Sequence, residues 1–338
     1  MISEPHRPKT AGSARPAAVN RSASFQTPGF DDDGLDIALM NNMPDAALDA
    51  TERQFRGLLA TVSDGRPIRL TLYTLPEVRR TDFGRQKVSR YANIDDLWTR
   101  DHDGLIVTGT EPVAVDLKEE PYWQSLTRVF DWAERHTFST ILSCLAAHAG
   151  TLHMDGIERR PIGQKRFGVF ECVRVSDHPL LAATPAHIRM PHSRWNEIPE
   201  EALNACGYRI LTRSNEAGVD AFVKERGSLF VFLQGHPEYE AITLLLEYRR
   251  DIGRYLRGER DTYPGMPEGY FDDATVDGLA ALQRRALVDR REELLSDFPI
   301  AEAAEKVTNT WRGAGEALYR NWLRYLWAQK VEYAAAAV

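Results

Sequence analysis

An apolar segment runs into small residues in the stretch Thr140-Ile141-Leu142-Ser143-Cys144-Leu145-Ala146-Ala147-His148-Ala149-Gly150. The segment 139–143 has the length and apolar character of a buried strand, and the small residues after it allow a helix to start close to a sheet. We therefore expect Cys144 at a strand-to-helix turn. There the positive end of the helix dipole and unpaired backbone N–H groups favour a thiolate.

The same turn predicts a binding site for an oxyanion. Backbone N–H groups of Leu145 and of Thr110, in the loop after the preceding strand, are expected at the same edge of the sheet. A cysteine that ends a central strand can equally be a small buried apolar residue. The local sequence alone therefore leaves the catalytic and structural interpretations open.

A second motif, Gly235-His236-Pro237-Glu238, follows the strongly apolar segment 229–233. A histidine at the carboxyl end of a sheet strand faces the crevice in which α/β proteins bind ligands. Glu238 can accept a hydrogen bond from the imidazole and fix its tautomer. Together with Cys144 upstream, the motif predicts a Cys-His-Glu triad for thiol acyl chemistry.

Alternating strands and helices surround these motifs. Strands are expected at 35–40, 68–75, 104–107 and 139–143, with helices at 46–62, 94–98 and 121–135 between them. This alternation predicts an α/β fold with a mostly parallel twisted sheet and helices on both faces. The next expected strands, 167–175, 208–212, 219–224 and 229–233, add antiparallel members to the sheet, and helices follow at 241–256, 276–295 and 311–333. The predicted organisation is a disordered N-terminal extension (1–33), an α/β core that carries these motifs (34–257) and a helical C-terminal extension packed on the core (258–338).

Composition excludes several classes of protein. The formal net charge of the 338 residues is −7, without a dense basic block, so we expect no nucleic-acid partner. No apolar run is long enough for a membrane span and no secretory signal is readable, so we expect a cytoplasmic protein without a membrane partner. The cysteines, Cys144, Cys172 and Cys206, are too few and too widely spaced for a disulfide framework or a structural zinc site, so no metal is expected.

Several motifs, in the same order along the chain, resemble the homoserine O-succinyltransferase/O-acetyltransferase family. They are Asn41-Asn42-Met43-Pro44, Gly104-Leu105-Ile106-Val107-Thr108-Gly109, Tyr122-Trp123, Asp131-Trp132, Pro191-His192-Ser193-Arg194, Gly235-His236-Pro237-Glu238-Tyr239 and Asn321-Trp322-Leu323. The resemblance implies a class I glutamine amidotransferase-like fold. It also implies ping-pong transfer of an acyl group from acyl-CoA to the hydroxyl of L-homoserine in methionine biosynthesis, with no cofactor beyond acyl-CoA as co-substrate, and a homodimer.

The resemblance also implies roles for individual residues. Cys144 would carry the acyl thioester, His236 would be the general base and Glu238 its orienting carboxylate. Lys165 and Ser193 would contact the substrate, and Arg250 would bind the amino-acid carboxylate, which suits a guanidinium fork.

The loop 108–113 departs from the family pattern. In the family, the position aligned with Val113 carries Gly in enzymes that use succinyl-CoA and Glu in enzymes that use acetyl-CoA. The absence of Glu there slightly favours succinyl-CoA. Glu111 lies nearby, and an unpaired buried carboxylate would repel a succinyl group. We therefore expect succinyl-CoA to be accepted if Val113 lines the acyl pocket and Glu111 points away. If Glu111 points into the pocket, we expect a preference for acetyl-CoA.

Other functions share these residues. A serine or another hydroxy amino acid could replace homoserine as acceptor. A glutamine amidotransferase would also use Cys-His-Glu, but the sequence around Cys144 lacks the flanking glycines of amidotransferase turns. A non-catalytic homologue is the third alternative. The presence of all four expected site residues argues against it, namely Cys144, His236, Glu238 and Arg250.

Overall fold

The computed structural model describes residues 34–336. A nine-stranded sheet in the order β2-β1-β3-β4-β9-β8-β7-β5-β6 forms its centre. The parallel part holds β1 (Leu35–Met40), β2 (Ile68–Tyr73), β3 (Gly104–Val107), β4 (Ser139–Ser143) and β9 (Ser228–Leu233). The antiparallel part holds β8 (Gly218–Arg226), β7 (Arg209–Ser214), β5 (Arg160–Arg174) and β6 (His187–Glu197). This confirms the predicted α/β class and the antiparallel extension of the sheet.

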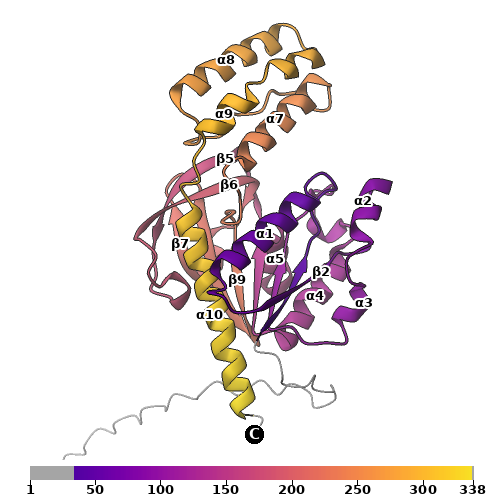
Figure 1. Cartoon of the computed structure of the whole chain (residues 1–338), viewed down its shortest axis with the longest axis vertical. Coiled ribbons are helices and arrows are strands. Elements are labelled where there is room, and N and C mark those ends of the chain that lie inside the picture. The colour runs from indigo at the N-terminus through magenta and orange to yellow at the C-terminus, as the bar shows by residue number, and fades with distance from the viewer. Residues whose placement is uncertain (1–33, 337–338) are drawn as a thin grey trace, which may run out of the picture.

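Helices cover both faces of the sheet (Figure 1). One face packs against α4 (Trp123–His136) and α5 (Leu145–Asp155), whose apolar side chains join those of the strands in one core cluster. In α4, Leu126, Val129, Phe130 and Ala133 recur at helical spacing, so a single stripe is buried. The other face packs against α1 (Leu48–Val62) and the long C-terminal helix α10 (Arg312–Ala336).

The remaining helices are mostly short. They are α2 (Asp82–Val88), α3 (Ile94–Leu97), α6 (Glu200–Ala205), α7 (Thr243–Leu256), α8 (Asp273–Val288) and α9 (Ile300–Lys306), with 3-10 turns at Leu117–Glu119, Pro179–Leu181 and Glu292–Asp297. The single helix expected at 276–295 is wrong from residue 289 onward, because α8 ends at Val288 and a separate 3-10 turn follows. In the part of the chain that the structure describes, no helix is long and apolar enough to cross a membrane.

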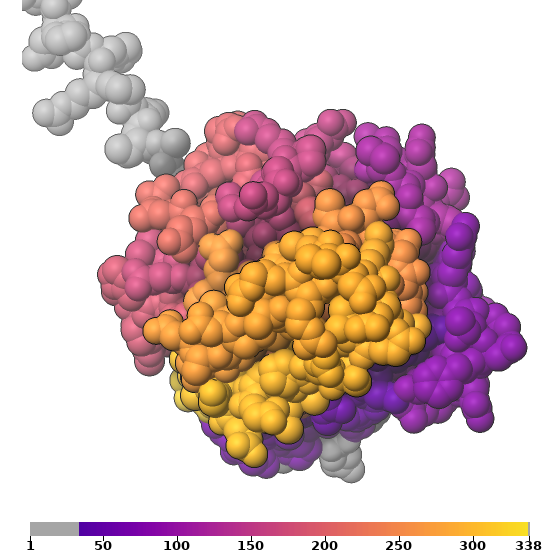
Figure 2. Space-filling view, turned by 90° about the horizontal axis from the view of Figure 1, so that it is seen from above, coloured from indigo at the N-terminus to yellow at the C-terminus, as the bar shows by residue number. Residues whose placement is uncertain are grey.

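The segment after α7 supports that helix. Side chains of α7, including Tyr248 and Ile252, share a core cluster with Leu279 and Leu282 of α8 and with Trp311. Seen from above, this segment forms the face nearest the viewer (Figure 2). The sequence alone indicates no function for residues 272–305. Their packing against α7 gives them a structural role, which is to hold this helix in place. The predicted domain boundary after residue 257 stays a prediction, and the predicted N-terminal extension (1–33) lies outside the described residues.

Candidate active site

Cys144 lies at the turn between β4 and α5, as predicted. It is the N-cap residue of α5, and its backbone adopts φ 52° and ψ −111°, a region that non-glycine residues rarely occupy. Its amide donates to the carbonyl oxygen of Leu233 over 2.7 Å, which ties the turn to β9. Such backbone strain is typical of functional positions that their surroundings hold in place.

His236 and Glu238 follow the neighbouring strand. Because β4 pairs with β9 in parallel, with Ser143 opposite Leu233, the carboxyl ends of both strands lie at the same edge of the sheet. Nδ1 of His236 lies 2.8 Å from Oε1 of Glu238, and both side chains are buried. Burial lowers the pKa of His236, but the negative charges of Glu238 and Cys144 outweigh it and raise the pKa well above its usual value. The arrangement therefore favours the protonated form of the His236 imidazole.

Tyr239 holds the imidazole from its other side. Its ring stacks on that of His236, with the centroids 4.2 Å apart and an interplanar angle of 17°. Its hydroxyl donates to Oε1 of Glu247 over 2.6 Å. The His236 ring is thus fixed in position by a carboxylate at its edge and an aromatic ring on its face.

Two loops meet beside the thiol. A Cβ added to Gly109 would lie only 2.9 Å from Cβ and 3.1 Å from the amide nitrogen of Leu145, so glycine is what permits this close approach. The approach brings Thr110 next to the start of α5. No hydrogen bond from the amide of Thr110 or Leu145 to another described residue is found. The two amides that the sequence predicts for an oxyanion are therefore adjacent and free to donate.

A cavity of about 650 Å³ opens above this edge of the sheet. Its lining includes all but one of the residues that the sequence predicts for the site, namely Cys144, His236, Glu238, Lys165, Ser193, Arg250, Thr110, Leu145 and Glu111. The exception is Val113. Segments far apart in the sequence thus build one cavity, as the shared strand-end position predicts.

The predicted substrate-binding residues gather around two carboxylates of α7. Ser193 donates to Oε2 of Glu247 over 2.5 Å, and Nζ of Lys165 lies 3.3 Å from Oδ2 of Asp251. Arg250 pairs with Oδ1 of Asp251 through Nε and Nη2, at 2.9 and 2.8 Å. Sequence reasoning missed Glu247 and Asp251, because acidic residues on a charged helix are ordinary. The two lie four residues apart in α7 and therefore on one face of the helix.

The loop after β3 turns Glu111, and not Val113, toward the cavity. The Val113 side chain is 69% exposed, so the idea that it lines the acyl pocket is wrong for this structure. Glu111 accepts two hydrogen bonds from Arg254, at 3.0 and 3.1 Å, and this pairing lowers the pKa of the Glu111 carboxyl. Glu111 is therefore a neutralised carboxylate, and the repulsion expected from an unpaired one is offset.

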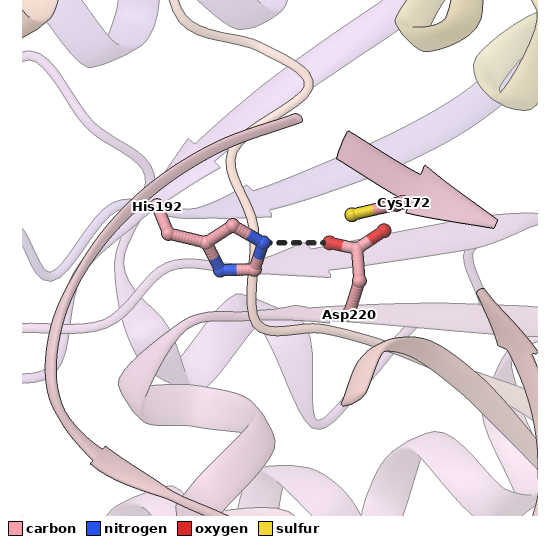
Figure 3. Close-up of side chains that lie close together, drawn as sticks. All are labelled: Cys172, His192 and Asp220. Atoms are coloured by element: carbon pink, nitrogen blue, oxygen red, sulfur yellow. Dashed lines mark ion pairs between the residues drawn. The ribbon is translucent and has the colours of Figure 1, made fainter. Parts of the chain in front are cut away.

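A buried cluster lies behind the site. Cys172, His192 and Asp220 present side-chain atoms within 4.8 Å of one another, and Figure 3 shows the imidazole of His192 facing the carboxylate. Nε2 of His192 lies 3.3 Å from Oδ1 of Asp220, whose other oxygen accepts from Thr212 over 2.7 Å. Burial raises the pKa of the Cys172 thiol, which keeps it protonated. The spacing of these three atoms would suit a metal ion. A protonated thiol beside a hydrogen-bonded carboxylate is also stable without a metal. The predicted absence of a metal therefore stays a prediction.

The fold and the site define an α/β enzyme with a cysteine and a His-Glu pair at the carboxyl ends of adjacent sheet strands. The chain belongs to the homoserine O-succinyltransferase family, whose model matches residues 24–333. Proteins named homoserine O-succinyltransferase from Methylorubrum extorquens and Rhodopseudomonas palustris are 49% and 47% identical to it over 290 residues. These matches cover 86% of this chain and 86% and 87% of those proteins.

Solved structures show more distant similarity. A glutamine amidotransferase from Methylobacillus flagellatus is 17% identical, covers 87% of this chain and 96% of its own, and gives a TM-score of 0.47. A glutamine amidotransferase from Thermotoga maritima is 13% identical, covers 87% and 98%, and gives a TM-score of 0.44.

Proposed function

We propose that this protein is a homoserine O-succinyltransferase that works through a thioester on Cys144. The observation that carries the proposal is the meeting of Cys144, His236 and Glu238 in one cavity with Lys165 and Arg250. The names of its relatives supply the acceptor and the acyl group. The family resemblance implies the place in methionine biosynthesis. The family assignment favours acyl transfer over the glutamine amidotransferase and non-catalytic alternatives.

In the first half-reaction, the Cys144 thiolate attacks the thioester carbonyl of succinyl-CoA. The amides of Leu145 and Thr110 donate to the oxyanion of the tetrahedral intermediate. As the intermediate collapses, the bond to the CoA sulfur breaks and the His236 imidazolium protonates the leaving thiolate. The products are free CoA and a succinyl thioester on Cys144, with neutral His236 beside it.

In the second half-reaction, homoserine enters with its carboxylate toward Arg250. His236, now neutral, takes the proton of the hydroxyl as its oxygen attacks the thioester. Collapse of the second intermediate releases the succinyl ester and returns the Cys144 thiolate and the His236 imidazolium. Glu238 and Tyr239 keep the ring in one orientation through both steps.

A matrix of donors and acceptors tests this function. Succinyl-CoA and acetyl-CoA are each mixed with homoserine and with serine, and release of free CoA is measured. We expect the highest kcat/KM for succinyl-CoA with homoserine. A preference for serine would change the assigned acceptor to serine, and a preference for acetyl-CoA would change the assigned donor to acetyl-CoA. Absence of CoA release in all four mixtures would reject the function.

Arg250→Lys is expected to impair the amino-acid half-reaction. A lysine ammonium cannot reproduce the planar fork that binds a carboxylate through two hydrogen bonds, so we expect KM for homoserine to rise by about 10-fold. Formation of the acyl-enzyme from succinyl-CoA alone should stay within about twofold of the wild type. Arg249→Lys, on the adjacent residue, which does not line the cavity, is the matched control. Loss of acyl-enzyme formation in Arg250→Lys would instead place Arg250 at the donor site.

Arg254→Met is expected to shift donor preference away from succinyl-CoA, because Glu111 would lose its partner and repel the succinyl carboxylate. Both side chains are partly exposed, so water screens the effect, and we expect the succinyl-to-acetyl ratio of kcat/KM to fall only about two- to fivefold. Combining Arg254→Met with Glu111→Gln should restore the ratio. An unchanged ratio in the single variant would remove this pair from donor selection.

We also propose a cytoplasmic homodimer. The described residues hold no helix that could cross a membrane, and the family resemblance implies a dimer. Analytical ultracentrifugation of the full chain tests the assembly, and a monomer at micromolar concentration would contradict it.

A further inference from the structure

The basic side chains that line the cavity are almost all engaged with partners. Lys165, Arg250 and Arg260 lie within 4.0 Å of Asp251, and Arg254 pairs with Glu111. Arg194 is buried and donates to the carbonyl oxygens of Asn196 and Ala217 and to Nδ1 of His192. Each of these groups therefore has a fixed structural partner before any substrate binds.

Arg159 differs from the others. It lines the cavity and is half-buried, but within the described part of the chain, residues 34–336, it makes no ion pair. Its one side-chain hydrogen bond runs from Nη2 to the carbonyl oxygen of Val115 over 3.2 Å. Burial lowers the pKa of Arg159, and the more distant Tyr122, Glu120 and Asp116 only partly offset this effect. A half-buried guanidinium without an anion at contact distance is costly, and a bound carboxylate would stabilise it.

The position of Arg159 relates it to the acyl group. The residue precedes β5 and lines the same cavity as Cys144. Arg159 also donates to the carbonyl oxygen of Val115, in the loop after β3. The amides of the two preceding residues, Val113 and Ala114, donate to Oε1 of Glu120, each over 2.6 Å. Arg159 therefore shares a cavity with the nucleophile and contacts the loop whose family counterpart distinguishes acyl donors.

Resting on the proposed function, we propose that Arg159 binds the distal carboxylate of the succinyl group and is the residue through which this enzyme recognises succinyl-CoA. Two methylene groups separate that carboxylate from the thioester carbon, so the carboxylate stays near Cys144 both in the donor and in the acyl-enzyme. The phosphates of CoA lie at the far end of the pantetheine arm, away from the nucleophile. The homoserine carboxylate has Arg250, on α7, as its expected partner.

Arg159→Gln tests this role, with butyryl-CoA as a donor whose acyl chain has the length of succinyl but no charge. We expect kcat/KM for succinyl-CoA to fall about 10- to 100-fold, the range for losing a charged hydrogen-bonded pair, while kcat/KM for butyryl-CoA changes by less than about twofold. For Arg159→Lys, kcat/KM with succinyl-CoA should lie between the values for the wild type and for Arg159→Gln, because lysine keeps the charge but cannot form the two parallel hydrogen bonds of a guanidinium. Acyl-enzyme formation, measured by mass spectrometry after rapid mixing with each donor alone, should show the same selectivity.

Arg160→Gln is the matched control. Arg160 is the adjacent residue, is exposed, pairs with Glu201 and does not line the cavity, so the donor ratio should stay at the wild-type value. Equal losses with both donors in Arg159→Gln would place Arg159 at CoA itself or in the fold, and no loss with either would exclude it from donor binding. Both results overturn the inference while leaving the function intact. Failure of the wild type to form a succinyl adduct on Cys144 would instead reject the proposed function.

Discussion

Cys144→Ala is expected to lower turnover of succinyl-CoA and homoserine by several orders of magnitude, because the proposed route needs a thioester that no other group in the cavity can form. The other two cysteines do not line the cavity, and Cys172 is buried. Cys144→Ser should be nearly as inactive, since a serine hydroxyl does not ionise as a thiol does. Neither change removes a large apolar side chain, so the thermal midpoint should stay close to that of the wild type.

Mass spectrometry locates the intermediate directly. Wild-type protein mixed with succinyl-CoA in the absence of homoserine should carry one succinyl group on Cys144, and addition of homoserine should remove it. Cys206→Ala is the matched control, because Cys206 is half-buried like Cys144 but lies outside the cavity. A stable adduct on Cys172 or Cys206, or full turnover in Cys144→Ala, would contradict the ping-pong mechanism.

The parts of the fold that sequence predicted well are those whose local pattern agrees with their final environment. The central strands β3 and β9 are short, mainly apolar runs because both of their faces are covered, and α4 is amphipathic because only one of its faces is covered. Placing Cys144 and His236 together needed only that both follow strands of one parallel sheet. That β4 and β9 are immediate neighbours could not be read from the chain, because strand order depends on long-range pairing.

Strand β6 was missed although it carries Ser193. Its sequence, His187–Glu197, includes two arginines, two histidines and a proline, and it lacks the apolar run or clean alternation that marks a strand. The strand is an edge strand of the sheet, where polar residues and proline are tolerated. Its partner β5 also begins seven residues earlier than expected, at Arg160 instead of residue 167, in an exposed polar stretch. Strand segments at the edge of the sheet therefore lack the apolar runs and the apolar/polar alternation by which strands are predicted from sequence.

The loop 108–113 shows a second limit of prediction from sequence. Reasoning from sequence recognised Glu111 as a possible repulsive charge, but its partner Arg254 lies 143 positions further along the chain. Charged residues on exposed helix faces carry no signal of their tertiary partner, so the neutralisation of Glu111 is visible only in the structure. Arg159 escaped notice for the opposite reason, because what distinguishes it is the lack of an ion-pair partner among residues 34–336.

Glu238→Gln is expected to lower kcat by about 10⁴-fold, comparable to the loss when the carboxylate of another catalytic triad becomes an amide. The carboxylate accepts from Nδ1 of His236 and so leaves Nε2 to face the thiol, whereas an amide can present its NH₂ group and favour the wrong tautomer. The change also removes a negative charge that raises the pKa of His236, so that pKa should fall. The imidazolium, which protonates the CoA leaving group, would then be lost at a lower pH than in the wild type.

The pH dependence of acyl-enzyme formation measures this effect separately from folding. In Glu238→Gln, the alkaline limb of the rate profile should move to lower pH, since the imidazolium deprotonates earlier, while a purely structural defect would lower the rate equally at every pH. Glu240→Gln is the matched control, because Glu240 lies two residues away and pairs with Arg53 at the surface. An unshifted alkaline limb in Glu238→Gln would show that Glu238 does not tune His236, and it would reduce the proposed triad to a Cys-His pair.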